Sequence, residues 1–234
     1  MKVYRYDDCM VAEEENSNVC IMQREFDFYK MSRDVKEQFV QESQLLSVRD
    51  VKDHFWMFLV VVMTILFTLV IYFRSGMYTL VDNQIVTATL FLLMNIPLHE
   101  LGHIIFLKMY CKESRIKAGF KFIFIYPAFY IDTSFSYFCP KYKRMCVYLA
   151  GNLMNCIFVL AIYVLCPQYL KYCYIIISNV LVNFIPIIKS DGYYTALTFL
   201  NRYNADNDKK KEFVDDFIRG ALMFGIMSVL SYLF

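Results

Sequence analysis

The sequence predicts a membrane protein of the all-α class, with about five transmembrane helices and one short β-hairpin. Of its 234 residues, 58% are hydrophobic and 18% are aromatic. An ordinary soluble domain has an apolar share of about 45 to 50%. Several apolar runs approach the roughly 20 residues that cross a bilayer as a helix. Basic residues gather between alternate runs, as the topology of a multi-pass membrane protein requires.

Residues 1–54 are polar and predict a small cytosolic segment ahead of a membrane domain that covers residues 55–234. This segment holds 8 Lys and Arg against 12 Asp and Glu, whereas the remaining residues hold 16 against 10. Within it, Val19 to Tyr29 predicts a β-hairpin, and Ser32 to Leu46 predicts a helix with a serine cap. No apolar core follows the first basic residues, so we expect insertion to depend on the internal spans.

The predicted spans are apolar runs that polar or basic loops separate, at residues 55–73, 87–110, 145–166, 172–188 and 213–234. Between the second and third spans, residues 119–132 (GFKFIFIYPAFYID) are too short and too broken for another span. They predict a hairpin against the membrane, where protein or a wet cavity covers its backbone. Of 24 basic residues, only Arg74 and Lys171 fall in the outer loops. This asymmetry predicts a cytoplasmic N-terminus and a C-terminus outside.

The composition argues against two other classes of site. The eight cysteines are scattered through apolar segments and include no Cys-x-x-Cys pair, so we expect small buried hydrophobes rather than disulfides or metal ligands. No Lys/Arg run is interleaved with stacking aromatics, which gives nucleic-acid binding little support.

The residues that carry chemistry lie in the second predicted span and read His99-Glu100-Leu101-Gly102-His103. On a helix, two histidines four residues apart share a face and can bind one zinc ion, with Glu100 beside them as general base. Ionisable residues within a span are costly. The cluster therefore predicts a functional site.

A hydrolytic zinc site takes three protein ligands and leaves one position for water. The remaining histidine, His54, lies in the polar segment before the first span, which favours a carboxylate as third ligand. Asp132, at the end of the predicted hairpin, and Asp191, after the fourth span, are the candidates. Asp191 is the better one, because Pro186 breaks the helix and Gly192 lets the backbone turn the carboxylate inward.

Two paired motifs resemble those of a known family. They are His-Glu-x-Gly-His at 99–103 and Asn-x-x-Pro-x-x-x-x-Asp-Gly at 183–192, with Ala-Gly-Asn-Leu-Met-Asn at 150–155 between them. Together they resemble the site-2 protease family of intramembrane zinc metalloproteases. The runs YPAFYIDTS at 126–134 and KSDGYY at 189–194 are similar to its bacterial peptide zinc metalloprotease branch. Members of that branch accompany gene systems for ribosomally made, exported peptides.

The resemblance covers about residues 55–200 and implies a complete site. It implies Glu100 as the catalytic base and three Zn²⁺ ligands, namely His99, His103 and Asp191. Asn155 and Asn183 match polar positions near the family's active site, where they could bind substrate backbone or a developing oxyanion.

Two points of the match leave alternatives open. Interhelical hydrogen bonding is the other interpretation of Asn155 and Asn183. Asn152 stands where the family commonly has proline, which affects the expected helix geometry rather than the chemistry.

The expected function is that of a zinc-dependent intramembrane endopeptidase, which cleaves a membrane-associated peptide or protein during maturation or export of a ribosomally synthesised peptide. One alternative is regulated intramembrane proteolysis of a signalling protein. Another is a non-proteolytic, zinc-containing partner of a peptide exporter or immunity system. Glu100 favours an enzyme, because a structural zinc site is normally closed by four protein ligands.

The expected partners are a peptide or membrane-protein substrate, the lipid bilayer and an ABC exporter. We expect a multi-pass protein of the cell membrane with its active site towards the cytoplasm.

Overall fold

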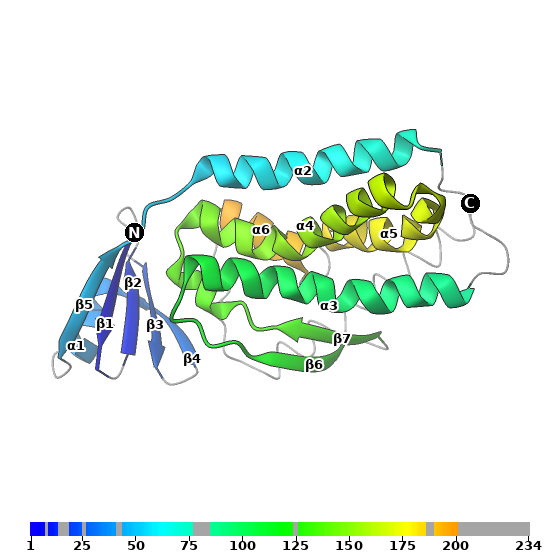
Figure 1. Ribbon diagram of the computed structural model, residues 1–234. Coiled ribbons are helices and arrows are strands. Elements are labelled where there is room, and N and C mark those ends of the chain that lie inside the picture. The colour runs from blue at the N-terminus through cyan, green and yellow to red at the C-terminus, as the bar shows by residue number, and fades with distance from the viewer. Residues whose placement is uncertain are drawn as a thin grey trace.

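The protein consists of a small β-sheet domain at one end of a helical bundle, with a β-hairpin alongside the bundle (Figure 1). The computed structural model describes residues 1–7, 9–13, 19–24, 27–40, 44–76, 85–123, 126–185 and 190–200.

The N-terminal domain is a five-stranded antiparallel sheet in the order β4-β3-β2-β1-β5, with one helix. Cys9 and Val11 of β2 share a buried cluster with Cys20 and Met22 of β3. Helix α1 covers this face, where the Lys36 ammonium lies over the ring of Tyr4. The elements are β1 (Lys2–Tyr6), β2 (Cys9–Glu13), β3 (Val19–Arg24), β4 (Asp27–Ser32), α1 (Arg33–Val40) and β5 (Leu45–Asp50).

This domain is more β-rich than the sequence indicated. The predicted hairpin at residues 19–29 is confirmed as β3 and β4. The predicted helix is wrong at its C-terminal end, because α1 stops at Val40 and Leu45 already belongs to β5. Pairing with β1, where Tyr4 lies opposite Val48, determines the conformation of this segment. A partner 44 residues away in sequence overrides the local helical pattern.

The opposite face of the sheet packs on the end of the bundle. Val3 and Ala12 join Leu107 and Phe138 in one buried cluster. The rings of Phe28 and Phe135 meet edge to face, with centroids 5.4 Å apart. The N-terminal domain is therefore packed against the helical domain through apolar side chains.

Among the described residues, three helices are long and apolar enough to cross a membrane, over Phe55–Arg74, Thr89–Tyr110 and Lys141–Leu165. They belong to α2 (Phe55–Arg74), α3 (Ile85–Tyr110) and α4 (Lys141–Leu165). About two-thirds of the most apolar part of α4 is buried, against less than a quarter for α2 and α3. Helix α4 is thus the central helix, and α2 and α3 pack against it.

Helix α4, which corresponds to the predicted third span, begins four residues before the predicted start at Met145. The added residues include Arg144, which is buried inside the protein. Its guanidinium donates hydrogen bonds to the carbonyl oxygens of Ser136, Tyr137 and Cys139. These carbonyls belong to a short 3-10 helix, η1 (Ser134–Phe138), and the residue after it. The arginine therefore fixes the turn that leads from the hairpin into α4.

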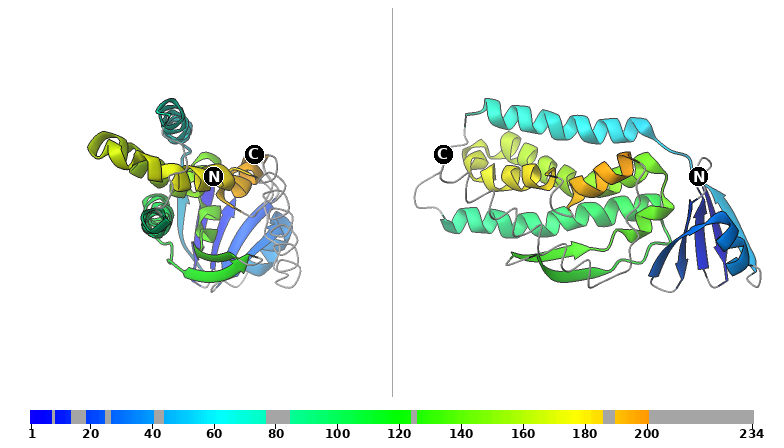
Figure 2. Two further views of the ribbon diagram at one scale, coloured as in Figure 1. Left: turned by 90° about the vertical axis from the view of Figure 1, so that its right-hand side faces the viewer. Right: turned by 180° about the vertical axis from the view of Figure 1, so that it is seen from behind.

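The predicted fourth span contains a short helix, α5 (Tyr174–Asn183), which follows the 3-10 helix η2 (Pro167–Cys173). Ten residues of helix rise about 15 Å, half of the hydrocarbon core of a bilayer. A further helix, α6 (Asp191–Phe199), was not predicted. Figure 2 shows α5 and α6 one after the other along α4. The predicted fifth span, residues 213–234, lies outside the described residues, so the count of five stays a prediction.

The hairpin predicted after the second span is confirmed as β6 (Ala118–Ile123) and β7 (Tyr126–Ile131). Asp132 N–H donates to the Lys117 carbonyl at 2.8 Å, and antiparallel pairs alternate along the ladder. The backbone groups of Ile131, Phe129 and Pro127 therefore point away from β6. Proline has no N–H to donate, which explains why this strand accepts Pro127 at that position.

All eight cysteines are free thiols, and seven of them are buried. Burial raises the pKa of the Cys139 thiol to about 12 and that of the Cys111 thiol to about 11. Burial therefore favours the neutral thiol form of both residues at neutral pH. The predicted burial is confirmed for seven of the eight cysteines, and Cys166 is partly exposed.

Candidate metal centre

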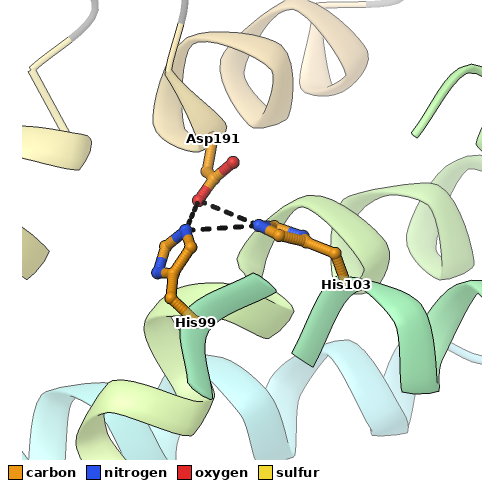
Figure 3. Close-up of side chains that lie close together, drawn as sticks. All are labelled: His99, His103 and Asp191. Atoms are coloured by element: carbon orange, nitrogen blue, oxygen red, sulfur yellow. Dashed lines mark hydrogen bonds and ion pairs between the residues drawn. The ribbon is translucent and has the colours of Figure 1, made fainter. Parts of the chain in front are cut away.

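The structure brings His99, His103 and Asp191 together (Figure 3). The two histidines lie one turn apart on α3, and Asp191 is the first residue of α6. Asp191 Oδ2 lies 3.0 Å from His99 Nε2 and 3.5 Å from His103 Nε2, and the two nitrogens are 3.3 Å apart. Three ligand atoms from two distant segments thus face one point.

This triangle has the dimensions of one face of a zinc tetrahedron. With bonds of about 2.0 to 2.1 Å, two ligand atoms of a tetrahedral zinc lie about 3.3 Å apart. Asp191 Oδ2 is buried and accepts no well-directed hydrogen bond from the described part of the chain, although both imidazoles are close. A buried acceptor without a hydrogen bond is costly. A cation at the centre of the triangle would satisfy it, so the donor set fits zinc.

The centre lies deep in the bundle. On α3, His103 and His99 are about 10 and 16 Å from the helix end at Tyr110. His103 is only 4% exposed. The end of α3 near Tyr110 and the start of α4 lie beside the N-terminal sheet (Figure 1), so the metal centre is nearer to the middle of the bundle than to that end.

Each imidazole also has a partner for its other ring nitrogen. His103 Nδ1 donates to the carbonyl oxygen of Val147 at 2.8 Å. His99 Nδ1 lies 3.2 Å from the side-chain amide of Asn155. Both partners belong to α4. The central helix therefore orients the two rings from behind while Nε2 of each faces the centre.

Asp191 reaches the centre because α5 ends at Asn183 and a separate helix, α6, begins at Asp191. The Ser190 hydroxyl donates to the carbonyl oxygen of Asn183 at 2.8 Å, which holds the two helix ends together. A Cβ atom at Gly192 would lie 2.3 Å from that same carbonyl oxygen. Glycine is thus required directly after the aspartate by close backbone approach.

The two predicted polar residues lie in different places. Asn155 contacts His99, whereas the Asn183 amide donates to Asn152 Oδ1 at 3.1 Å. Asn152, the departure from the family pattern, therefore links α4 to α5. The expected roles of Asn155 and Asn183 towards substrate stay predictions.

The predicted base, Glu100, contacts the hairpin. Its Oε2 accepts the backbone N–H of Ile131 at 2.8 Å. Ile131 is the last residue of β7, so the hairpin lies directly beside the motif on α3. This contact could not be predicted from the sequence, because the register of β7 alone decides which N–H faces the glutamate.

Asp132, the other candidate for the third ligand, has a structural role. Its Oδ1 accepts the backbone N–H of Ser134 at 2.9 Å, at the start of η1. Among the described residues it is not part of the metal-binding group, which contains Asp191.

Gly151 belongs to the motif at 150–155, but no role in the site was predicted for it. A Cβ atom there would lie 2.4 Å from His99 Nε2 and 2.7 Å from His103 Nε2. Glycine on α4 therefore makes room for the two imidazoles. The available signal was a glycine inside an apolar span, a common feature where helices approach closely.

We expect Gly151→Ala to weaken zinc binding by about tenfold or more, the size of effect that displaced ligand support produces. The added methyl group would occupy the space in which both imidazoles now lie. Chelator competition with the purified protein measures the zinc affinity. Wild-type affinity in this variant would show that the imidazoles do not bind metal in the observed position.

Comparison with known proteins identifies a similar protein. The chain is similar to a Bacillus subtilis (strain 168) protein named "Putative peptide zinc metalloprotease protein YydH". The two are 34% identical over 119 residues, which are 48% of this chain and 47% of the relative. The chain thus spans about half the length of this curated relative. No protein-family profile and no solved structure matches the chain.

Proposed function

We propose that this protein is a zinc-dependent intramembrane endopeptidase of the site-2 protease type. The observation that carries the proposal is the group His99, His103 and Asp191, which has the size of a zinc site. Its two histidines lie on α3, a helix long and apolar enough to cross a membrane. The name of the Bacillus subtilis relative agrees with a zinc protease.

The chemistry divides between the metal and Glu100. When bound, zinc supplies a Lewis acid that polarises a peptide carbonyl and makes water more acidic. Glu100 directly follows His99 on the helix, and its carboxylate takes a proton from water and passes it to the leaving amine. The hydrogen bond from Ile131 N–H restrains the carboxylate beside the two histidines.

The hairpin offers a way to hold an extended substrate. The outward edge of β7 presents the backbone N–H and carbonyl of Phe129 and the carbonyl of Ile131, whose N–H already donates to Glu100. This strand packs against α3. A substrate strand that adds to this edge would pass Glu100, and its carbonyls that face away from β7 would be free of helical hydrogen bonds. Unwinding of this kind is necessary, because a helical substrate has its carbonyls occupied in its own hydrogen bonds.

The proposed substrate is a membrane-associated peptide or protein, in the maturation or export of a ribosomally made peptide, with an ABC exporter as partner. The basic residues at the end of α3 and the start of α4 support a cytoplasmic position of the N-terminal sheet, because positive residues favour that side. These residues are Lys108, Lys112, Arg115, Lys117, Lys141 and Lys143.

The depth of cleavage tests the proposal. We would reconstitute the zinc-loaded protein in liposomes with a synthetic single-span peptide whose apolar stretch contains a central Asn-Pro pair, and map the products by mass spectrometry. The expected cut falls within the apolar stretch. A peptide with an all-leucine stretch should be cut at about a tenth of this rate or more slowly still, since its carbonyls stay in helical hydrogen bonds. Cleavage only outside the apolar stretch would contradict an intramembrane site.

A further inference from the structure

Asn155 lies behind the metal centre, on the side of His99 that faces away from the metal ligands. Its side chain is fully buried on α4. The amide nitrogen lies 3.2 Å from His99 Nδ1, and Oδ1 has no hydrogen-bond partner in the described part of the chain. A buried carboxamide oxygen without a partner carries a cost in free energy.

The tautomer of His99 decides what this contact does. Nε2 faces the other two ligand atoms, so zinc binding requires its lone pair, and the ring proton must then lie on Nδ1. A protonated Nδ1 cannot accept from the amide NH₂ group. It can donate to an amide oxygen, which has nearly the same size and position after a half-turn of the carboxamide.

We infer that Asn155 is a positioning residue for the metal, with its Oδ1 accepting the Nδ1 proton of His99 when zinc is bound. This inference rests on the zinc site of the proposed function. The 3.2 Å separation from Nδ1 is compatible with either orientation of the carboxamide, and only the orientation with Oδ1 towards Nδ1 suits a zinc-bound His99. This orientation also gives the unpartnered Oδ1 a donor.

The second histidine provides an internal comparison. His103 Nδ1 faces the backbone carbonyl of Val147, a group that only accepts. His103 therefore always has its proton on Nδ1 and its Nε2 ready for metal. Asn155 provides the corresponding acceptor for the Nδ1 proton of His99. Because this acceptor is a side chain and not a backbone carbonyl, it can be removed by mutation.

Zinc affinity distinguishes this role from substrate binding. In Asn155→Leu, a change that keeps the approximate size and removes the acceptor, we expect affinity to fall by 10- to 100-fold, the usual effect of losing a hydrogen bond behind a metal ligand. Asn155→Asp keeps an acceptor and should bind zinc at least as tightly as the wild type. Competition with a fluorescent chelator in detergent measures all variants.

Asn95→Leu is the matched control. Asn95 is also a fully buried asparagine, one turn before His99 on α3, and neither of its amide atoms has a hydrogen-bond partner among the described residues. Its replacement should leave zinc affinity within about twofold, since no hydrogen bond behind a ligand is lost. Equal losses in both leucine variants would mean general damage to packing and would overturn the inference.

Wild-type zinc affinity in Asn155→Leu would also overturn the inference. If this variant kept its zinc affinity but no longer cleaved casein, a general protease substrate, Asn155 would instead have a role in substrate binding. If the variants do not fold, NMR of the zinc-loaded wild type with ¹⁵N-labelled histidine gives the answer. We expect His99 to carry its proton on Nδ1, and metal on Nδ1 would refute the role of Asn155. Neither result depends on whether the protein cleaves peptides.

Discussion

Replacing Glu100 with glutamine is expected to abolish peptide cleavage and leave zinc bound. Glutamine keeps the shape of the side chain and can still accept the N–H of Ile131, but it cannot take a proton. Loss of a general base reduces the rate about 10²- to 10⁴-fold. Cleavage of fluorescein-labelled casein in dodecyl maltoside measures the rate of peptide hydrolysis. Inductively coupled plasma mass spectrometry measures the zinc bound to the protein.

The control for this change is Asp132→Asn, an equivalent neutralisation of a nearby carboxylate. Asparagine can still accept the N–H of Ser134, so we expect zinc content and cleavage near those of the wild type. The Glu100 variant also separates the enzyme from a non-proteolytic zinc protein. If Glu100→Gln cleaves casein as fast as the wild type, the protease proposal is wrong, even with zinc in the site.

Asp191→Ala has the second large expected effect, the loss of zinc. Two histidines on one helix turn remain, and a hydrolytic site needs three protein ligands. We expect the purified variant to contain less than about a tenth of the wild-type zinc. Loss of a ligand should lower zinc affinity by more than the 10- to 100-fold that is usual when a residue hydrogen-bonded to a ligand is lost. Zinc analysis after gel filtration in detergent is the measurement.

A second variant separates ligand loss from damage to α6. Asp191→Asn keeps the size of the side chain at the first residue of this helix and removes its charge, so it should also bind zinc weakly. Asp132→Ala removes the other candidate carboxylate and should retain zinc. Unchanged zinc in both Asp191 variants would exclude this residue as third ligand.

The sequence alone determined the features that depend on local periodicity. The spacing of His99 and His103 places both imidazoles on one face of any helix. The apolar runs predicted the three long helices with errors of a few residues at their ends. The hairpin followed from β-forming residues around Pro127, whose missing N–H suits the outward edge of β7.

Other features depended on partners far away in the sequence. Residues 45–50 form β5 because they pair with β1. The helix that the sequence predicted up to Leu46 therefore ends at Val40. Asp191 was chosen from the sequence because of Pro186 and Gly192, but only the packing of α6 on α4 brings its carboxylate within 3.0 Å of His99.

The supporting residues of the centre were visible only in three dimensions. Nothing in the local pattern around Asn155 or Gly151 says that one faces a histidine ring and the other makes room for two. Their positions follow from how closely α3 and α4 approach, which the whole bundle decides. The sequence therefore determined which groups can bind zinc, and the tertiary structure decided that they meet, since ligand geometry is a property of packed helices.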